Sequence, residues 1–384
     1  MARFFLILFA LGLAAGTTAC GQAASTQPTS TAPETVVKQL FPSPAYGMHT
    51  NIWWKPDLIE DDLALVKDMG FTWVKQKFPW REIEGIEKGH YDWYRPDRIV
   101  EATEAAGLNL IVRLDRQPFW SEPQDNLWHE NQAPGDLQDF ADFCGAVASR
   151  YHGRIAAYQV WNEPNLSREW GELPPDPVHY TEMLKVCYEA IKKADPQAIV
   201  VSAGLAPTGT SSDHAMPDIE FLQGMYDAGA AAYFDVLGVN APGYKAPPEL
   251  SPAEAEDAAY GGGRWFAFRH VEDMRDLMVA NGDAAKQIAI LEMGWTLDQV
   301  NPDYQWFAVD EKTQADYLVR AYQYAAEHWQ PWIGLMTTIY IPDYNWTAEA
   351  NEQWWWSIVL PDGTPRPAYY ALRDMEKVQQ TIAD

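Results

Sequence analysis

The chain has 384 residues, and its 54 Asp and Glu against 28 Lys and Arg give a formal net charge of -26. Such a surface repels nucleic acid and anionic lipid headgroups, so we expect neither as a partner. Hydrophobic residues make up 47% of the chain, enough for a substantial core in one large domain or two ordinary ones.

Residues 1–20 predict a signal peptide for export. Arg3 supplies a short positive segment, and the apolar run after it is too short to span a bilayer stably. Small residues then lead into Cys20, which resembles a lipoprotein signal whose cysteine is lipidated and becomes the mature N-terminus. Thr17 stands where that signal usually has an aliphatic residue, so ordinary cleavage near Ala19 or Ala23 stays an alternative. Both interpretations predict an exported protein, either secreted or a cell-surface lipoprotein.

Residues 21–40 predict a flexible linker, because Ser, Thr, Pro, Gln and Ala dominate and large apolar side chains are few. Residues 41–384 are predicted to form one domain.

Within that domain, a short β-rich run and an amphipathic helix alternate eight times. Gly70 and Gly107 follow two of the helices as C-cap residues. The expected strands are Tyr46–Trp54, Phe71–Phe78, Leu108–Asp115, Ala156–Asn162, Ala198–Leu205, Phe234–Asn240, Gln287–Glu292 and Ile333–Ile341. The expected helices are Leu58–Met69, Arg95–Ala106, Gly135–Tyr151, Val178–Ala194, Ile219–Ala228, Trp265–Ala280, Lys312–Trp329 and Pro367–Gln379.

This alternation predicts an α/β fold, a single (β/α)8 TIM barrel of parallel strands joined by right-handed crossovers. An open doubly wound sheet is the alternative. That fold usually has a glycine-rich phosphate loop after its first strand, whereas Trp53–Pro56 stands there in this chain. The longest loops are expected after the third, sixth and eighth strands.

Two cysteines fall on predicted neighbouring helices of the barrel, Cys144 on the third and Cys187 on the fourth. A disulfide between them can form after export. Two buried free thiols are the favoured interpretation, because a core of this size needs no covalent staple.

Two glutamates stand at strand ends, where a TIM barrel places its chemistry. Glu163 follows the fourth strand and Glu292 closes the seventh. A carboxylate at the end of an apolar strand is costly unless it has partners or a function. Glycoside hydrolysis needs two such groups around one bond, one neutral to protonate the departing oxygen and one ionised to attack the anomeric carbon.

The surrounding motifs resemble those of clan A glycoside hydrolases, and families 39 and 5 are the most similar. Trp161–Asn165 reads Trp-Asn-Glu-Pro-Asn, like the segment that carries the acid/base in these enzymes. Leu291–Trp295 reads Leu-Glu-Met-Gly-Trp, similar to their nucleophile motif. Further stretches agree at residues 80–97, 140–153 and 361–369. The resemblance implies Glu163 as acid/base and Glu292 as nucleophile.

The resemblance further implies a retaining enzyme that cleaves β-linked oligo- or polysaccharides by double displacement through a covalent glycosyl-enzyme. A carbohydrate, expected to be neutral, is the substrate and water is the second substrate. No metal-binding or cofactor motif is found, so no cofactor is expected. Two alternatives stay open: a barrel that binds glycans without catalysis, and a transglycosidase.

Several further residues are candidates for substrate binding. By resemblance, Asn162 contacts the sugar 2-hydroxyl and Tyr244 donates a hydrogen bond to the nucleophile, although Tyr244 is equally well a loop aromatic. Arg113, together with Lys75 or Lys77, supplies positive charge to the nucleophile or contacts hydroxyls. An ion pair near Asp115 is the slightly favoured interpretation of Arg113.

The remaining candidates are aromatic and polar residues at strand ends. His49 and Asn51 end the first strand and are expected to contact a distal sugar, although a histidine there is as often structural. Trp295, Tyr340 and Trp346 are candidate platforms for stacking on a sugar ring. Clan A enzymes often carry a tryptophan at the end of strand eight, where this chain has Tyr340.

Overall fold

The computed structural model describes residues 36–123, 130–379 and 382. The predicted signal peptide, with Cys20, and linker residues 21–35 lie outside the described residues. At the end of the predicted linker, the amides of Lys38 and Leu40 already donate hydrogen bonds to Ala285 and Gln287.

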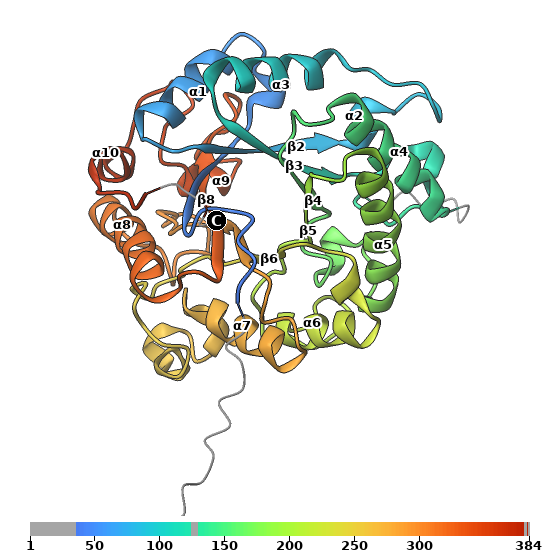
Figure 1. The fold of residues 1–384 in the computed structure, drawn as a ribbon. Coiled ribbons are helices and arrows are strands. Elements are labelled where there is room, and N and C mark those ends of the chain that lie inside the picture. Colours follow the sequence, from blue (N-terminus) through green and yellow to red (C-terminus); the bar gives the residue numbers. More distant parts are fainter. Residues whose placement is uncertain (1–35, 124–129, 380–381, 383–384) are drawn as a thin grey trace, which may run out of the picture. The chain divides into compact units, whose positions relative to one another are not determined.

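Eight parallel strands ringed by helices form a barrel (Figure 1), which confirms the predicted TIM barrel. The strands are β1 Ala45–Thr50, β2 Trp73–Pro79, β3 Asn109–Asp115, β4 Ala157–Val160, β5 Ile199–Val201, β6 Leu237–Asn240, β7 Ile288–Met293 and β8 Ile333–Ile341. Neighbours pair in the order β5-β4-β3-β2-β1-β8-β7-β6. Parallel bridges at Val201–Val236 and Leu205–Val239 join the two ends of this sheet.

Each strand of the barrel is followed along the chain by the helix that the sequence predicts, and short helices are added. The helices are α1 Ile59–Asp68, α2 Trp80–Ile83, α3 Tyr94–Ala106, α4 Leu137–Arg150, α5 Pro177–Ala194, α6 Asp218–Asp227, α7 His270–Ala280, α8 Glu311–His328, α9 Gln353–Trp356 and α10 Pro367–Asp374. The longest segments separate β3 from α4, β6 from α7 and β8 from α10, which confirms the prediction of long loops after the third, sixth and eighth strands.

Some predicted bounds are wrong. The first strand ends at Thr50, because residues 52–54 form a 3-10 turn. The fifth strand is only Ile199–Val201, since its later residues meet β6 through isolated bridges. The predicted helix Trp265–Ala280 begins at His270, and its first residues form another 3-10 turn.

The alternation of side chains along the strands sorts the core into two layers. In β2, Trp73 packs with other apolar residues in one buried cluster, while Val74 and Phe78 pack in a second, larger cluster with the helices. Lys75 and Lys77 lie two and four residues after Trp73, so they share its inward face. The barrel interior is therefore apolar at one end and charged at the other.

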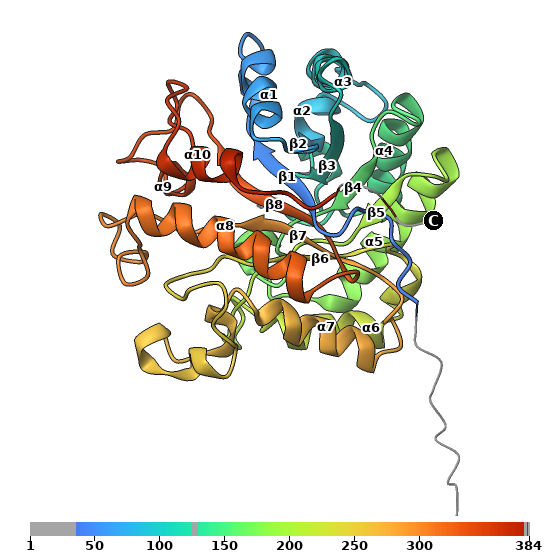
Figure 2. The same cartoon turned by 60° about the vertical axis from the view of Figure 1, so that its left-hand side comes forward.

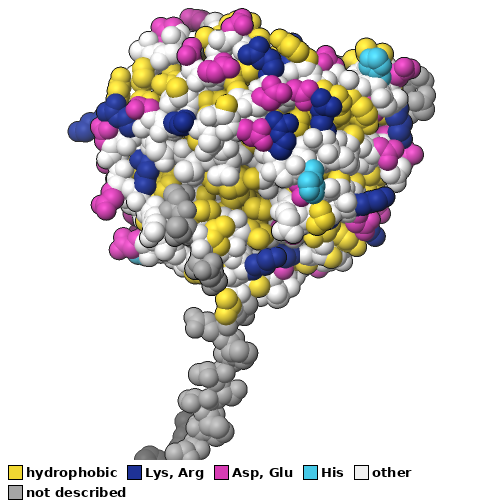
Figure 3. Space-filling view, turned by 45° about the horizontal axis from the view of Figure 1, so that its top comes forward, with side chains coloured by type: hydrophobic (Ala, Val, Ile, Leu, Met, Phe, Trp, Pro, Cys, Tyr) yellow, Lys and Arg dark blue, Asp and Glu magenta, His cyan; other side chains and the backbone are white. Residues whose placement is uncertain are grey.

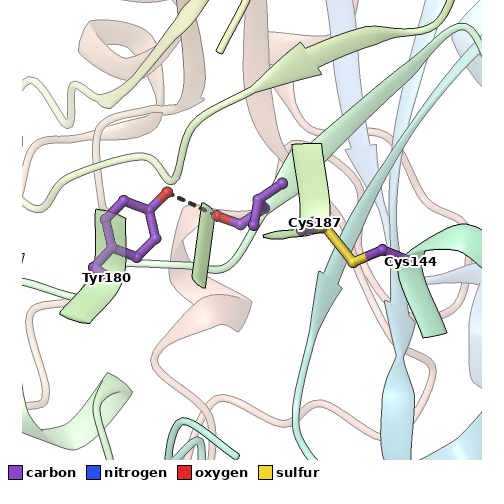
Figure 4. The surroundings of a disulfide bond; sticks show 4 residues. Cys144, Tyr180 and Cys187 are labelled. Carbon is purple, nitrogen blue, oxygen red and sulfur yellow. Dashed lines mark hydrogen bonds between the residues drawn. A yellow bond between two sulfur atoms is a disulfide. The ribbon is translucent and has the colours of Figure 1, made fainter. Parts of the chain in front are cut away.

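Cys144 and Cys187 form a disulfide, so the expectation of two free thiols is wrong (Figure 4). They lie on α4 and α5, which pack side by side, with 5.5 Å between their Cα atoms. This separation is typical of a disulfide. Beside it, the Tyr180 hydroxyl donates to the carbonyl of Val160 at 3.0 Å and ties α5 to β4. Core size gave no reason to expect the bond; the facing positions on two packed helices allow it.

The long connections after β6, β7 and β8 gather at one end of the barrel (Figure 2). On the face drawn in Figure 3, basic and acidic side chains are interspersed with apolar and uncharged ones. None of the helices in the described ranges has the combined length and hydropathy of a bilayer-crossing segment.

Candidate active site

A cavity of about 770 Å³ opens where the strands end, and both predicted catalytic glutamates line it. Glu163 follows β4, and Glu292 lies within β7. Asn240 connects the two: it pairs in register with Glu292 across β6 and β7, and its amide donates to Oε1 of Glu163 at 2.9 Å. A register irregularity at Asn240 accompanies this pairing.

Glu292 is surrounded by donors and cations. Lys75 donates to its Oε1 at 3.0 Å, Arg113 to the same atom at 3.4 Å, and the Tyr340 hydroxyl to Oε2 at 3.4 Å. Burial alone would raise the pKa of Glu292, but the charges of Lys75 and Arg113 more than offset it and the pKa is lowered. Glu292 is therefore ionised at neutral pH.

Glu163 is held by different groups. Besides the amide of Asn240, Arg168 donates to its Oε2 at 3.2 Å. The backbone here is left-handed, with φ of 71° at Trp161 and 40° at Glu163. Such backbone conformations are unfavourable for residues other than glycine and cluster at functional sites.

Two more carboxyl groups line the wall near Glu163. Burial, and next the negative charge of Glu163, raise the pKa of Glu169 to about 7, and Asn131 donates to its Oε2 at 3.0 Å. Burial also raises the pKa of Glu352 to about 7, with the charge of Arg168 opposing it. This wall is therefore rich in carboxyl groups, in contrast to the cationic surroundings of Glu292.

Uncharged polar atoms also face the cavity. Asn162 and Asn240 each have a buried side-chain oxygen without a hydrogen-bond partner among the described residues, and neither ring nitrogen of His49 has one. Burial, and then the charges of Lys75 and other cations, lower the pKa of His49 well below its ordinary value, so the ring is neutral. Such groups can donate to or accept from sugar hydroxyls.

Most of the predicted binding residues line this cavity. They are His49, Arg113, Asn162, Tyr244, Tyr340 and Trp346. Arg113 combines both interpretations, because its Nε also lies 2.7 Å from Oδ2 of Asp115. Tyr340 and Trp346 meet edge to face with ring centroids 5.3 Å apart, and together they form an aromatic wall.

Three predicted roles need correction. The hydroxyl of Tyr244 donates to the carbonyl of Pro207, so Tyr340 and not Tyr244 is the tyrosine bonded to Glu292. Trp295 is fully buried behind Gly243 and is no stacking platform. Its indole N–H donates to a backbone carbonyl within the fold.

Asn51 also lies outside this cavity. Its side-chain amide donates to the carbonyl of Ile341 at 3.2 Å, which ties the end of β1 to the end of β8. It lines a neighbouring small chamber instead. A strand-end position did not decide which way this side chain points.

Sequence reasoning missed several lining residues. They are Arg116, Arg168, Glu169, Asn240, Phe307, Glu352 and Trp356. Asn240 had a usable signal, because it is the polar residue that ends β6. Phe307 lies in the long connection after β7, and Glu352 and Trp356 lie at the two ends of the short helix α9 in the connection after β8, where no local pattern predicts the path of the chain. Within the described part of the chain, no three His, Cys, Asp or Glu side chains are grouped so that they could hold a metal ion.

Comparisons with known proteins agree with the fold and the motifs. Residues 36–225 match the model of the cellulase family, glycosyl hydrolase family 5. A β-xylosidase of Geobacillus stearothermophilus is 25% identical over 150 residues, which are 36% of this chain and 27% of that protein. The chain thus spans about a quarter of this curated relative.

Solved structures of similar fold include a family 39 glycoside hydrolase from the gut symbiont Bacteroides cellulosilyticus WH2. Its TM-score is 0.63 at 19% identity, and the match covers 88% of this chain and 64% of that one. A monomeric β-xylosidase from Caulobacter crescentus CB15 matches with a TM-score of 0.60 at 18% identity, covering 87% of this chain and 68% of that one. Together with the family match, these likenesses confirm the resemblance to clan A glycoside hydrolases.

Proposed function

We propose that this chain, which resembles the clan A glycoside hydrolases, is a retaining glycoside hydrolase that cleaves β-linked oligo- or polysaccharides. One observation carries the proposal: Glu163 and Glu292 line one cavity in contrasting electrostatic surroundings. Cations keep Glu292 ionised, whereas Glu163 lies on the wall with Glu169 and Glu352. Carboxyl groups with such different surroundings suit opposite roles in acid–base and nucleophilic catalysis.

In the proposed reaction, Glu163 gives its proton to the glycosidic oxygen as that oxygen leaves the anomeric carbon. Glu292 attacks the same carbon and forms a covalent ester with the sugar. Glu163 then takes a proton from water, whose oxygen attacks the anomeric carbon and displaces Glu292. Two inversions give net retention. Retaining enzymes hold the two carboxyl groups about 5–5.5 Å apart.

The neighbours of Glu292 support its role as the nucleophile. Lys75 also donates to the carbonyl of Leu291 at 2.9 Å, so the ammonium fixes both the strand and the carboxylate. Tyr340 donates to the other carboxylate oxygen. A nucleophile oriented in this way has fewer rotamers to lose on the way to the transition state. Because two relatives are named β-xylosidases, an aryl β-xyloside is the first substrate to test.

Substitution of each carboxyl group tests the assignment. We expect Glu292→Gln to lower kcat by more than about 10⁴-fold on every substrate, because no covalent intermediate can form. Glu163→Ala should lose about 10²–10⁴-fold on substrates with poor leaving groups, and much less on aryl glycosides whose leaving group needs no proton. Initial rates over a set of aryl β-glycosides with graded leaving-group pKa measure this.

The exposed carboxylate of Glu182 on α5 provides a control, and Glu182→Gln should keep wild-type rates. Equal losses in the two active-site variants on all leaving groups would contradict the assigned roles. A wild-type protein that binds glycans but hydrolyses no glycoside would instead favour a binding function. Product analysis with an added alcohol acceptor separates hydrolysis from transglycosylation.

Export is part of the proposal. The disulfide between Cys144 and Cys187 supports it, since disulfides persist mainly in oxidising compartments. Lipidation would attach the exported protein to a membrane through Cys20. Metabolic labelling with a fatty acid, in the natural chain and in Cys20→Ala, tests this step; equal labelling of both proteins would exclude it.

A further inference from the structure

Positive charge concentrates on the β2–β3 side of the catalytic cavity. Lys77 and Arg113 are direct neighbours in the register of these strands, and both line the cavity. Like charges side by side on a sheet are destabilising. Burial, followed by the charges of Arg113 and Arg116, lowers the pKa of Lys77 to about 8. The net charge of the whole chain is -26, so the positive charge at this place is opposite in sign to the charge of the protein as a whole.

Lys77 differs from the other cations here in having no partner. Lys75 is bonded to Glu292, and Arg113 is paired with Asp115 and Glu292. The Lys77 ammonium makes no hydrogen bond or ion pair within the described ranges, although it is more than half buried. A partly buried cation that lines the cavity without a protein partner can bind a negative group of a ligand, which would offset the cost of its partial burial.

Arg116 is held beside Lys77 by an unusual backbone. It follows β3 directly and has a φ of 62°, in the left-handed region. Its guanidinium lies 3.5 Å from a carboxylate oxygen of the half-exposed Glu130, which leaves donors free for another anion. Conformations of this kind are unfavourable for residues other than glycine and cluster at functional sites.

A small chamber adjoins Lys77 and Arg116. Lys77 and Arg116 line both the main cavity and the chamber, whose other walls include Trp53 and Gln76. Its volume is about 40 Å³. One water molecule needs roughly 10–15 Å³ on this measure, so the chamber accepts a group of a few heavy atoms. A carboxylate or sulfate fits this space, and a whole sugar ring does not.

We propose that Lys77 and Arg116 bind an anionic substituent, the carboxylate of a uronic acid or a sulfate ester, on a sugar held in the catalytic cavity. The proposal rests on the proposed function, which places a sugar there, and it replaces the expectation of a neutral substrate with an acidic one. Arginine offers a fork of donors to an oxyanion, and lysine adds a compact charge.

The preference for an acidic sugar should depend on pH. As the pH rises above about 8, Lys77 loses its charge and the preference should decline. Glu292 is already ionised, and His49 is already neutral. Burial also lowers the pKa of Lys75 to about 8, and Glu169 and Glu352 in the same cavity have pKa values of about 7, so only the part of the decline that Lys77→Met removes is assigned to Lys77. The charged groups that face Lys77 are Arg113 and Asp115 on β3, Arg116 after it and Glu292 on β7, with Glu82 lining the adjoining chamber.

Binding of three simple sugars tests the proposal without relying on turnover. Titration calorimetry at pH 7 compares glucuronate, glucose 6-sulfate and glucose on the full chain. We expect at least one acidic sugar to bind about tenfold more tightly than glucose, and Lys77→Met and Arg116→Gln each to remove most of that difference. Glucose binding should fall by less than the binding of the acidic sugar. The matched control is Lys185→Met, at an exposed lysine on α5.

The two acidic sugars separate a carboxylate substituent from a sulfate ester. Equal binding of all three sugars by the wild-type protein, no measurable binding of either acidic sugar, or a preference that survives both substitutions would overturn the proposal. Failure of the hydrolase assignment would look different. In that case calorimetry would still show tighter binding of an acidic sugar, while Glu292→Gln would change no rate of glycoside hydrolysis. Aryl β-glycosides hydrolysed without any acidic preference would overturn only this inference.

Discussion

At the scale of single residues, neighbouring side chains shift the pKa values of chemically identical carboxyl groups in opposite directions. Glu292 receives hydrogen bonds from Lys75, Arg113 and Tyr340, and its pKa falls despite burial. Glu169 is also deeply placed, but burial and the nearby charge of Glu163 dominate, and its pKa rises to about 7. The sequence identified the two strand-end carboxylates, but their partners became visible only when the strands were placed around one cavity.

Glu169 and Glu352 should make the protein less stable as the pH rises. Their folded-state pKa is about 7, above the ordinary glutamate value, so the folded chain binds more protons between about pH 4.5 and 7. The stabilisation of the folded chain by these extra protons is fully present below about pH 4.5 and is lost as the pH rises to about 7. Glu169→Gln should therefore raise the free energy of unfolding by about 1–3 kcal/mol at pH 8 and change little at pH 4.

Urea unfolding from pH 4 to 8 measures this change, with Glu182→Gln as the surface control. A difference between Glu169→Gln and the wild-type protein that is the same at both ends of the pH range would contradict the assigned titration. The buried carboxyl groups would then reflect packing alone.

At the scale of elements, strand alternation and register place the catalytic groups. In β2, inward positions two residues apart carry Trp73, Lys75 and Lys77, so one strand supplies both core and active site. In β7, the register with β8 shifts between Ile290 and Met293, next to Glu292, the proposed nucleophile. Such an irregularity can redirect a side chain at the rim of a barrel.

The first residues of α6 and α7 are joined by a buried histidine. His270 lies 2.9 Å from Asp218 and 2.9 Å from Asp273. Burial would lower its pKa, but the two carboxylates outweigh burial and raise it to about 9. The stabilisation from the charged ring is fully present below about pH 6.5 and is lost as the pH rises through about 9.

We expect His270→Gln to lower the free energy of unfolding by roughly 2–3 kcal/mol at pH 6 and by clearly less at pH 10. Thermal unfolding at both pH values measures the difference. His152→Gln serves as the control, because the His152 side chain is 61% exposed. A loss that does not depend on pH would show that His270 acts through packing and not through its charge.

At the scale of the whole molecule, contacts between β5 and β6 close the barrel, and one disulfide cross-links two of its outer helices. β5 and the residues after it meet β6 through isolated bridges and a few backbone hydrogen bonds rather than through a continuous ladder. The disulfide lies elsewhere, between α4 and α5, and spans 43 residues of sequence. A cross-link of this span stabilises mainly by restricting the unfolded chain.

Replacing Cys144 and Cys187 with alanine should lower the free energy of unfolding by up to about 4 kcal/mol, on the chain-entropy estimate for a loop of this length. Unfolding in urea, with and without reductant, measures it. The wild-type protein unfolded under reducing conditions should approach the alanine variant, and that variant should not respond to reductant. Equal stability of the oxidised and reduced wild-type protein would contradict this role for the disulfide.

The sequence by itself determined the barrel and the positions of Glu163 and Glu292, because the periodicity of strands and helices and the residues at strand ends are local properties. Only the tertiary structure decided which side chains meet. It placed Tyr340 and not Tyr244 against Glu292, buried Trp295 and joined Cys144 to Cys187. These outcomes depend on register, on the direction in which each side chain points and on loop paths, all set by packing between segments far apart in the chain.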